Sequence, residues 1–182
     1  MNRRDAIRQA GLLAGAATLW ASLPARTWAA LSAPEGGSAE DEALLTLIGD
    51  TIIPTTASSP GAGAIGIGRF ILTMAPACYS AESVAALTRG LGEIQAESER
   101  LHARKFQELT VAQREAVLID YEKRSAAMNG PAPNSFRLIK ELTLLGYFTS
   151  ESGATQALRY LPIPGGYRGS VPLAKGERSW AL

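Results

Sequence analysis

Apolar residues recur at helical spacing along most of the chain. Within residues 41–53 they occupy positions 44, 45, 47, 48, 52 and 53, which is the periodicity of an amphipathic helix. Pro54 is expected to end this helix, and residues 54–68 are rich in Pro, Gly, Ser and Thr, which favours a long loop. A short apolar segment over residues 69–75 follows, and Pro76 is expected to stop it.

Helix-capping residues divide the rest of this region. Ser80 can cap a helix expected over residues 81–106, since a serine at this position accepts a hydrogen bond from the first turn. The further predicted elements are a helix opened by a capping box of Thr110 and Gln113 and running to about Met128, a helix opened by Asn134 and ending near Gly146, and a brief helix over residues 150–158. Strands and helices do not alternate, so the sequence predicts an all-α fold.

The C-terminal residues follow a different pattern. Residues 159–182 read RYLPIPGGYRGSVPLAKGERSWAL, in which prolines and glycines separate single apolar residues. This composition disfavours a helix and favours an extended arm. The expected organisation is therefore a linker over residues 31–40 and a small helical domain over residues 41–182, which includes the irregular, extended C-terminal arm over residues 159–182.

Residues 1–30 have the order of regions found in an export signal. Arg3 and Arg4 precede an apolar run over residues 10–21, which is followed by Pro24 and small residues. The run is too short for a permanent transmembrane helix, which needs about 20 apolar residues. Paired arginines before a weakly apolar run resemble a twin-arginine (Tat) signal, although Ala6 stands where phenylalanine is usual. We therefore expect export to the periplasm by the Tat pathway, with a Sec signal or an amphipathic anchor as the alternative.

Charge and residue counts exclude several function classes. The formal net charge is +1, and the arginines of residues 1–30 leave the rest of the chain slightly acidic. The chain thus lacks the basic stripe that nucleic acid requires. Cys78 and His102 are the single cysteine and the single histidine. An intrachain disulfide and a Cys/His zinc site of about four ligands are therefore impossible.

Three short motifs could suggest chemistry, but their context argues against it. Residues 61–66 match G-x-G-x-x-G, yet no strand precedes them, so a loop is expected rather than a dinucleotide site. Glu99 and His102 form one E-x-x-H, whereas a di-iron bundle needs two copies. Cys78 has no histidine or acid of a nucleophilic site near it in sequence, although His102 could approach it. The sequence predicts no catalytic, cofactor-binding or metal-binding residue in this chain.

The C-terminal half resembles the gluconate 2-dehydrogenase subunit 3 family. The resemblance rests on Phe136 and Lys140, the run LTLLGYFTSESG over residues 142–153, the P-x-P-G-x-Y of residues 162–167, and the closing residues 179–181. It covers about residues 42–182, with the twin-arginine leader in front. Many relatives carry a second cysteine where this chain has Ser170, which leaves the role of Cys78 open.

The resemblance implies an accessory subunit that is not an enzyme by itself. Such proteins are small subunits of periplasmic FAD-dependent dehydrogenases that oxidise sugars, polyols or sugar acids. The FAD is expected in a separate flavoprotein of the glucose–methanol–choline (GMC) type, and haem c is possible in a third, cytochrome c subunit. The small subunit carries the flavoprotein through the Tat pathway, which explains a Tat leader on a chain without an evident cofactor site.

The run LTLLGYF suggests both a core and an interface. Leu142 and Leu145 are expected in the core, and Phe148 suits either role. The aromatic, proline and glycine positions that follow exceed what a small helical core needs, and tyrosine is favoured at interfaces. The predicted partner interface comprises Tyr147, Phe148, Tyr160, Pro162, Pro164, Gly165 and Tyr167. Two alternatives stay open: a free-standing periplasmic chaperone or binding protein, and a small periplasmic enzyme that uses Cys78 or His102.

Overall fold

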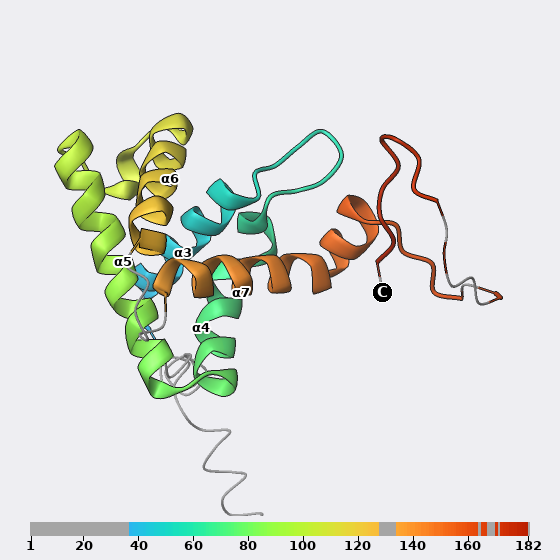
Figure 1. Cartoon of the computed structure of the whole chain (residues 1–182), viewed down its shortest axis with the longest axis horizontal. Helices are drawn as coiled ribbons and strands as arrows, with labels where there is room; N and C mark the ends of the chain where they lie inside the picture. The colour runs from blue at the N-terminus through green and yellow to red at the C-terminus, as the bar shows by residue number, and fades with distance from the viewer. Residues whose placement is uncertain (1–36, 128–133, 164, 167–169, 171, 182) are drawn as a thin grey trace, which may run out of the picture. The chain divides into compact units, whose positions relative to one another are not determined.

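The computed structural model describes residues 37–127, 134–163, 165–166, 170 and 172–181. All of these lie in one compact unit, Glu35–Leu182. The predicted export residues Arg3 and Arg4 lie outside the described residues. The helices are α3 (Ala39–Ile52), η1 (Ala62–Ile65), α4 (Ile67–Cys78), α5 (Ala81–His102), η2 (Phe106–Glu108), α6 (Val111–Ala127), α7 (Ser135–Thr149) and the π-helical turn η3 (Gly153–Ala157), shown in Figure 1.

The all-α class is confirmed. The described residues contain no strand, and their only extended pairing is one isolated bridge between Arg159 and Trp180. The predicted capping box is present, because Thr110 N donates to Gln113 Oε1 at 3.0 Å and Gln113 N donates to Thr110 Oγ1 at 3.4 Å. Asn134 also caps its helix. Local capping chemistry thus fixes where α6 and α7 begin.

Helix α3 begins earlier than the hydrophobic pattern predicted. Ser38 is its N-cap, since Asp41 N donates to Ser38 Oγ at 3.1 Å and Ser38 N donates to Asp41 Oδ2 at 2.9 Å. This reciprocal pair satisfies two amides that a helix start leaves free. The last residues of the expected linker, 39–40, are therefore helical.

Two expected helix stops are wrong. Pro76 lies inside the last turn of α4, where only two helical residues follow it, so the helix ends just beyond the missing N–H bond. Gly146 is interior to α7 rather than its C-terminal stop. A Cβ atom at Gly146 would lie 2.6 Å from a ring carbon of Phe70 and 2.7 Å from Cδ1 of Ile67. The glycine lets α7 approach α4 closely.

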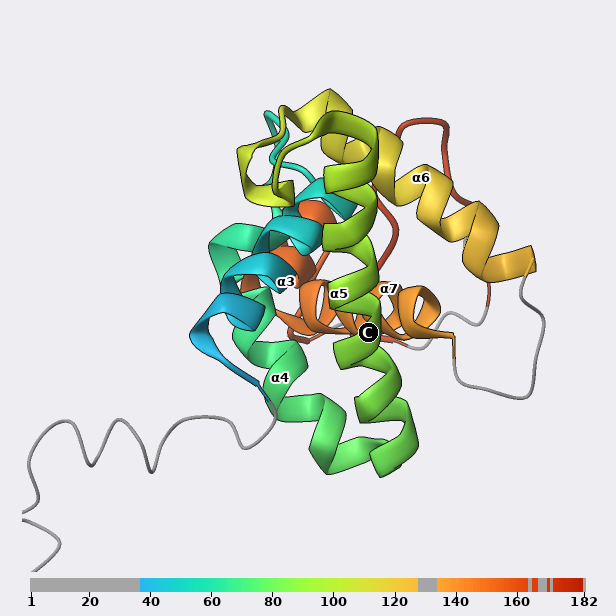
Figure 2. The same ribbon diagram turned by 90° about the vertical axis from the view of Figure 1, so that its left-hand side faces the viewer.

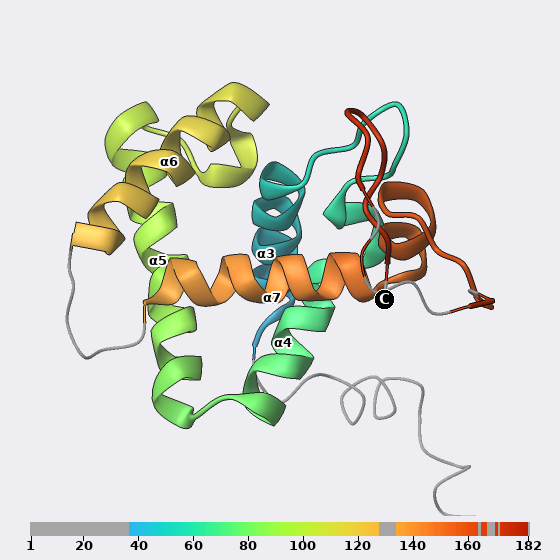
Figure 3. The same ribbon diagram turned by 45° about the vertical axis from the view of Figure 1, so that its right-hand side comes forward.

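Helix α7 lies across the other helices and organises the core. In Figure 3 it crosses α3, α4 and α5, and it packs against all three and against α6. Figure 2 shows α5 in front of α7, with α6 packed beside the upper part of α5. The fully buried side chains come from every one of these elements and include Leu45, Ile48, Ile67, Ile71, Ile94, Phe106, Val117, Ile139 and Leu142. The core is therefore complete before the C-terminal arm begins.

Candidate functional site

The second half of α7 presents apolar side chains to solvent. Leu144 is 39% exposed, Leu145 45% and Phe148 38%. Positions three and four apart lie on one face of a helix, so these residues form a continuous stripe. Leu138, near the start of α7, is only 6% exposed. The helix thus buries its apolar residues in its first half and leaves three of them exposed in its second half.

Two residues of this helix differ from the sequence prediction. Tyr147, expected at a partner interface, is 1% exposed and donates a hydrogen bond from its hydroxyl to the carbonyl of Pro60 at 2.7 Å. Leu145, expected in the core, is exposed instead. Helix α7 buries the face that bears Leu142, Thr143, Gly146 and Tyr147 against its neighbours, and Leu145 lies outside that face. Tyr147 is therefore a core residue that ties α7 to the loop before η1.

The arm continues the exposed apolar character of α7. Tyr160 is 50% exposed, Leu161 46% and Ile163 83%, and Leu173 is 60% exposed where the chain returns. The predicted interface residues Pro162 and Gly165 are exposed as well, whereas Pro164 and Tyr167 lie outside the described residues. We define the apolar surface as Leu144, Leu145, Phe148, Tyr160, Leu161, Ile163 and Leu173. Of these, sequence reasoning had selected Phe148 and Tyr160, and alternation of apolar residues with proline was the signal that could have found Leu161 and Ile163.

The glycine-rich segment packs against its own protein. It follows α3 rather than a strand, as expected, but it contains the short helix η1 instead of being an open loop. Gly63 N donates to Asp50 Oδ1 at 3.2 Å, and a Cβ atom at Gly61 would collide with the same carboxylate. A carboxylate thus occupies the position where a nucleotide-binding loop needs free amides for phosphate. These glycines allow close contact with α3.

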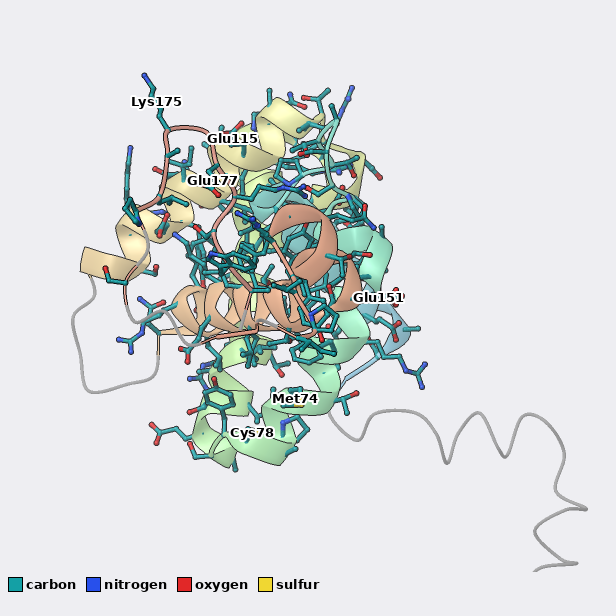
Figure 4. The ribbon with its side chains drawn as sticks, turned by 90° about the vertical axis from the view of Figure 1, so that its right-hand side faces the viewer. Met74, Cys78, Glu115, Glu151, Lys175 and Glu177 are labelled. Carbon is teal, nitrogen blue, oxygen red and sulfur yellow. The ribbon has the colours of Figure 1, made fainter. Side chains whose placement is uncertain are left out.

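Cys78 and His102 lie at opposite ends of α5. Cys78 is exposed at the end of α4, just before α5 begins, and is labelled at the lower end of the molecule in Figure 4. His102 is the last residue of α5, and the rise of 1.5 Å per residue separates the ends of this helix by about 30 Å. The two residues cannot form a nucleophile–base pair within one chain. Among the described residues, no group of three or more His, Cys, Asp or Glu side chains could hold a metal ion.

One buried carboxylate joins α5 to α6. Glu97 is 4% exposed and forms ion pairs with Arg100 and with Arg124, the latter at 2.8 Å. The hydrogen bond from Arg100 outweighs burial and, with the charge of Arg124, lowers the pKa of Glu97 to about 2. Glu97 is thus a paired anion at neutral pH and is a poor proton acceptor. These side chains line an open hollow together with Glu93, Ala96 and Tyr121.

Tyr121 completes this polar contact between helices. Its hydroxyl donates to Glu93 Oε2 at 2.5 Å and lies 2.8 Å from Ser135 Oγ. Burial, followed by the hydrogen bond to Glu93, raises the pKa of Tyr121 to about 12. The phenol is therefore neutral at ordinary pH, and the cluster holds α5, α6 and the start of α7 together.

Comparison with known protein families identifies the family of this chain. A profile of gluconate 2-dehydrogenase subunit 3 matches residues 39–165. The chain belongs to the gluconate 2-dehydrogenase subunit 3 family. The match begins with α3 and runs through the first described residues of the arm, so it includes nearly all of the apolar surface. Comparisons with curated proteins and with solved structures found no match.

The family name denotes one subunit of a dehydrogenase, which agrees with an accessory role in a larger complex. The apolar surface consists of exposed leucine, isoleucine, tyrosine and phenylalanine side chains. None of the helices in the described part of the chain combines the length and apolar composition needed to cross a membrane.

Proposed function

We propose that this protein is the non-catalytic small subunit of a periplasmic, FAD-dependent dehydrogenase complex that oxidises sugars, polyols or sugar acids. Its role is to carry the catalytic flavoprotein through the Tat pathway, to stabilise it and to dock it in the complex. The flavoprotein is of the GMC type and holds the FAD. A cytochrome c subunit with haem c is a possible third component.

The apolar surface carries this proposal. Isolated exposed apolar side chains are ordinary in folded proteins, but several on one helix face are typical of a contact site. Leu144, Leu145 and Phe148 share one helix face, and the arm adds Tyr160 and neighbouring residues directly after η3. Membership of a family named for one subunit of a dehydrogenase supports assigning this surface to the rest of that complex.

The other sites of the chain support a non-catalytic role. In the glycine-rich segment, the amide of Gly63 is bonded to the carboxylate of Asp50. Cys78 is separated from His102 by the length of α5. Glu97 forms ion pairs with two arginines. Each of these groups therefore has a structural role or lacks a chemical partner. The oxidation chemistry is assigned to the flavin of the partner subunit.

The docking experiment compares two exposed aliphatic residues. Leu145→Asp places a charge in the apolar surface, and Ile119→Asp places one on α6, where Ile119 is 44% exposed compared with 45% for Leu145. Full-length subunit and flavoprotein are co-expressed, and the amount of flavoprotein that co-purifies is measured. We expect Leu145→Asp to reduce co-purification at least tenfold, which corresponds to a loss of about 1.4 kcal/mol or more of binding free energy. We expect Ile119→Asp to leave co-purification unchanged. Equal co-purification of both variants and the wild type would place the interface elsewhere.

The export experiment tests the carrier role separately. Arg3→Lys together with Arg4→Lys removes the paired arginines while it keeps the positive charge. We expect both this subunit and the flavoprotein activity to stay in the cytoplasmic fraction. A flavoprotein that still reaches the periplasm would show that it is not carried by this chain.

A further inference from the structure

The end of the chain returns to the base of the arm. Arg159 N donates to the carbonyl of Ser179 at 2.9 Å, and Ala181 N donates to the carbonyl of Arg159 at 2.9 Å. These bonds form the bridge that pairs Arg159 with Trp180. The sequence predicted an extended arm, and the structure adds that the two ends of this arm are joined beside η3.

Side chains reinforce this closure. The guanidinium of Arg159 lies 4.2 Å from the centre of the Trp180 ring and forms an ion pair with Glu177 at 2.6 Å. Arg178 donates to the carbonyl of Gln156, in η3, at 2.6 Å. We call these contacts of residues 156–159 with residues 177–181 the clasp. Arg159 is its centre, since it provides two backbone bonds, a cation–π contact and an ion pair.

The clasp does not bury the side chains that it encloses. Tyr160, Leu161, Ile163 and Leu173 lie between its two ends and are all at least 46% exposed. The closure itself is built from surface contacts, and single exposed ion pairs contribute little to folding. Because the clasp does not bury these apolar residues, it gives the free subunit little stability. Its benefit appears when another surface covers those residues, because an ordered segment loses less entropy on binding.

We infer that Arg159 and Trp180 are positioning residues that hold the two ends of the arm together and so present Tyr160, Leu161 and Leu173 to the catalytic flavoprotein. This inference rests on the proposed function, since the partner is the one assigned there. Affinity for the flavoprotein then depends on residues 177–181, which close the arm. These residues lie beyond residue 165, where the family match ends.

The test separates closure from direct contact. Trp180→Ala removes the ring contact of Arg159 and is expected to weaken the clasp. Lys175→Ala is the control, because Lys175 makes none of the clasp contacts and projects outward from the same part of the arm (Figure 4). A third variant, Arg159→Cys with Trp180→Cys and Cys78→Ser, removes both side chains but can replace them by a disulfide. Neighbouring extended chains lie about 4.8 Å apart, within the roughly 4.4–6.8 Å that a disulfide spans between Cα atoms. Affinity of the full-length subunit for the flavoprotein is measured with and without a thiol reductant.

Trp180→Ala is expected to weaken binding on the order of tenfold, and Lys175→Ala to leave it unchanged. The oxidised double-cysteine variant is expected to bind like the wild type, and its reduced form like Trp180→Ala. In the free subunit, hydrogen exchange at the amides of Arg159 and Ala181 should be faster in Trp180→Ala and slow again in the oxidised variant.

Two results would overturn the clasp. If oxidised and reduced double-cysteine variants bind equally weakly, the side chain of Arg159 or Trp180 contacts the partner directly, and closure does not explain the loss. If all variants bind like the wild type, closure is irrelevant to docking. Both results differ from failure of the proposed function, in which the wild-type subunit itself would not bind the flavoprotein.

Discussion

The helical body and the C-terminal arm contain similar large apolar side chains in different environments. Ile139 and Leu142 in α7 are fully buried, whereas Ile163 in the arm is 83% exposed and Leu173 is 60% exposed. The body is held together by burial of such side chains, with a few buried polar contacts such as Glu97. The arm is held by the bonds and the ring contact of Arg159.

This difference assigns the two regions different tasks. Burial of apolar area stabilises the body in the free subunit. In the arm the same kind of area stays in water, so its free energy is available for association. Changes in the body should therefore alter folding first, and changes in the arm should alter binding first.

Tyr147→Ala should destabilise the subunit most. The variant removes a side chain that is 1% exposed and breaks its hydrogen bond to Pro60. Truncation of a buried aromatic residue costs about 3–5 kcal/mol. Urea unfolding of the full-length subunit measures the loss, and Tyr147→Phe, which keeps the ring, should lose only about 1 kcal/mol. A Tyr147→Ala subunit as stable as the wild type would return this residue to the surface role that the sequence suggested.

Gly153→Ala should cause the next largest loss. A Cβ atom at Gly153 would collide with the backbone carbonyl of Tyr147, which cannot move without disturbing α7. Such overpacking costs about 1–3 kcal/mol. Gly166→Ala is the matched control in the arm, because nothing lies within 4 Å of its added methyl group. Equal melting temperatures of the two variants would contradict the tight joint between α7 and η3.

Glu97→Gln should cost about 1–2 kcal/mol at neutral pH, because it removes charged hydrogen bonds to Arg100 and Arg124. The pKa of Glu97 is lowered to about 2 in the folded protein, below the value of about 4.3 in an unfolded chain. The unfolded state therefore binds the proton first, and the contribution of Glu97 is complete above about pH 5 and is lost as the pH falls towards 2. The stability difference between wild type and variant should shrink over this range. Glu99→Gln, an exposed change on the same helix, is the control, and a difference independent of pH would contradict the ion pairs.

The sequence predicted the local boundaries of the body better than its contacts. Thr110 and Asn134 act through hydrogen bonds to residues three positions away, so single-sequence reasoning could place them. The usual roles of Gly146 and Pro76 predict helix stops, which the structure does not show at either position. The actual role of Gly146 depends on Phe70, which is distant in the chain. Tertiary packing overrode the local preference.

The candidate site could be predicted only in part, because burial of its residues also depends on contacts between distant parts of the chain. Tyr147 and Phe148 are adjacent aromatic residues, and their composition does not show which one is buried. That choice depends on the carbonyl of Pro60, 87 positions away. The exposed arm could be predicted from its prolines and glycines, but its closure could not, because it joins Arg159 to Trp180 through long-range contacts.

Tyr160→Ala combined with Tyr167→Ala should have the smallest effect on the fold. Tyr160 is 50% exposed and lies beyond η3, and exposed substitutions usually change stability by less than about 0.5 kcal/mol. The far-UV circular dichroism of the free variant should therefore match that of the wild type. Its affinity for the flavoprotein should fall, since loss of one anchoring tyrosine at an interface costs roughly 2 kcal/mol, or about thirtyfold. A collapse of helicity would place these tyrosines in the fold. An unchanged affinity together with unchanged helicity would show that the two tyrosines are not anchors, and the contact would then be sought first on the exposed face of α7, at Leu144, Leu145 and Phe148.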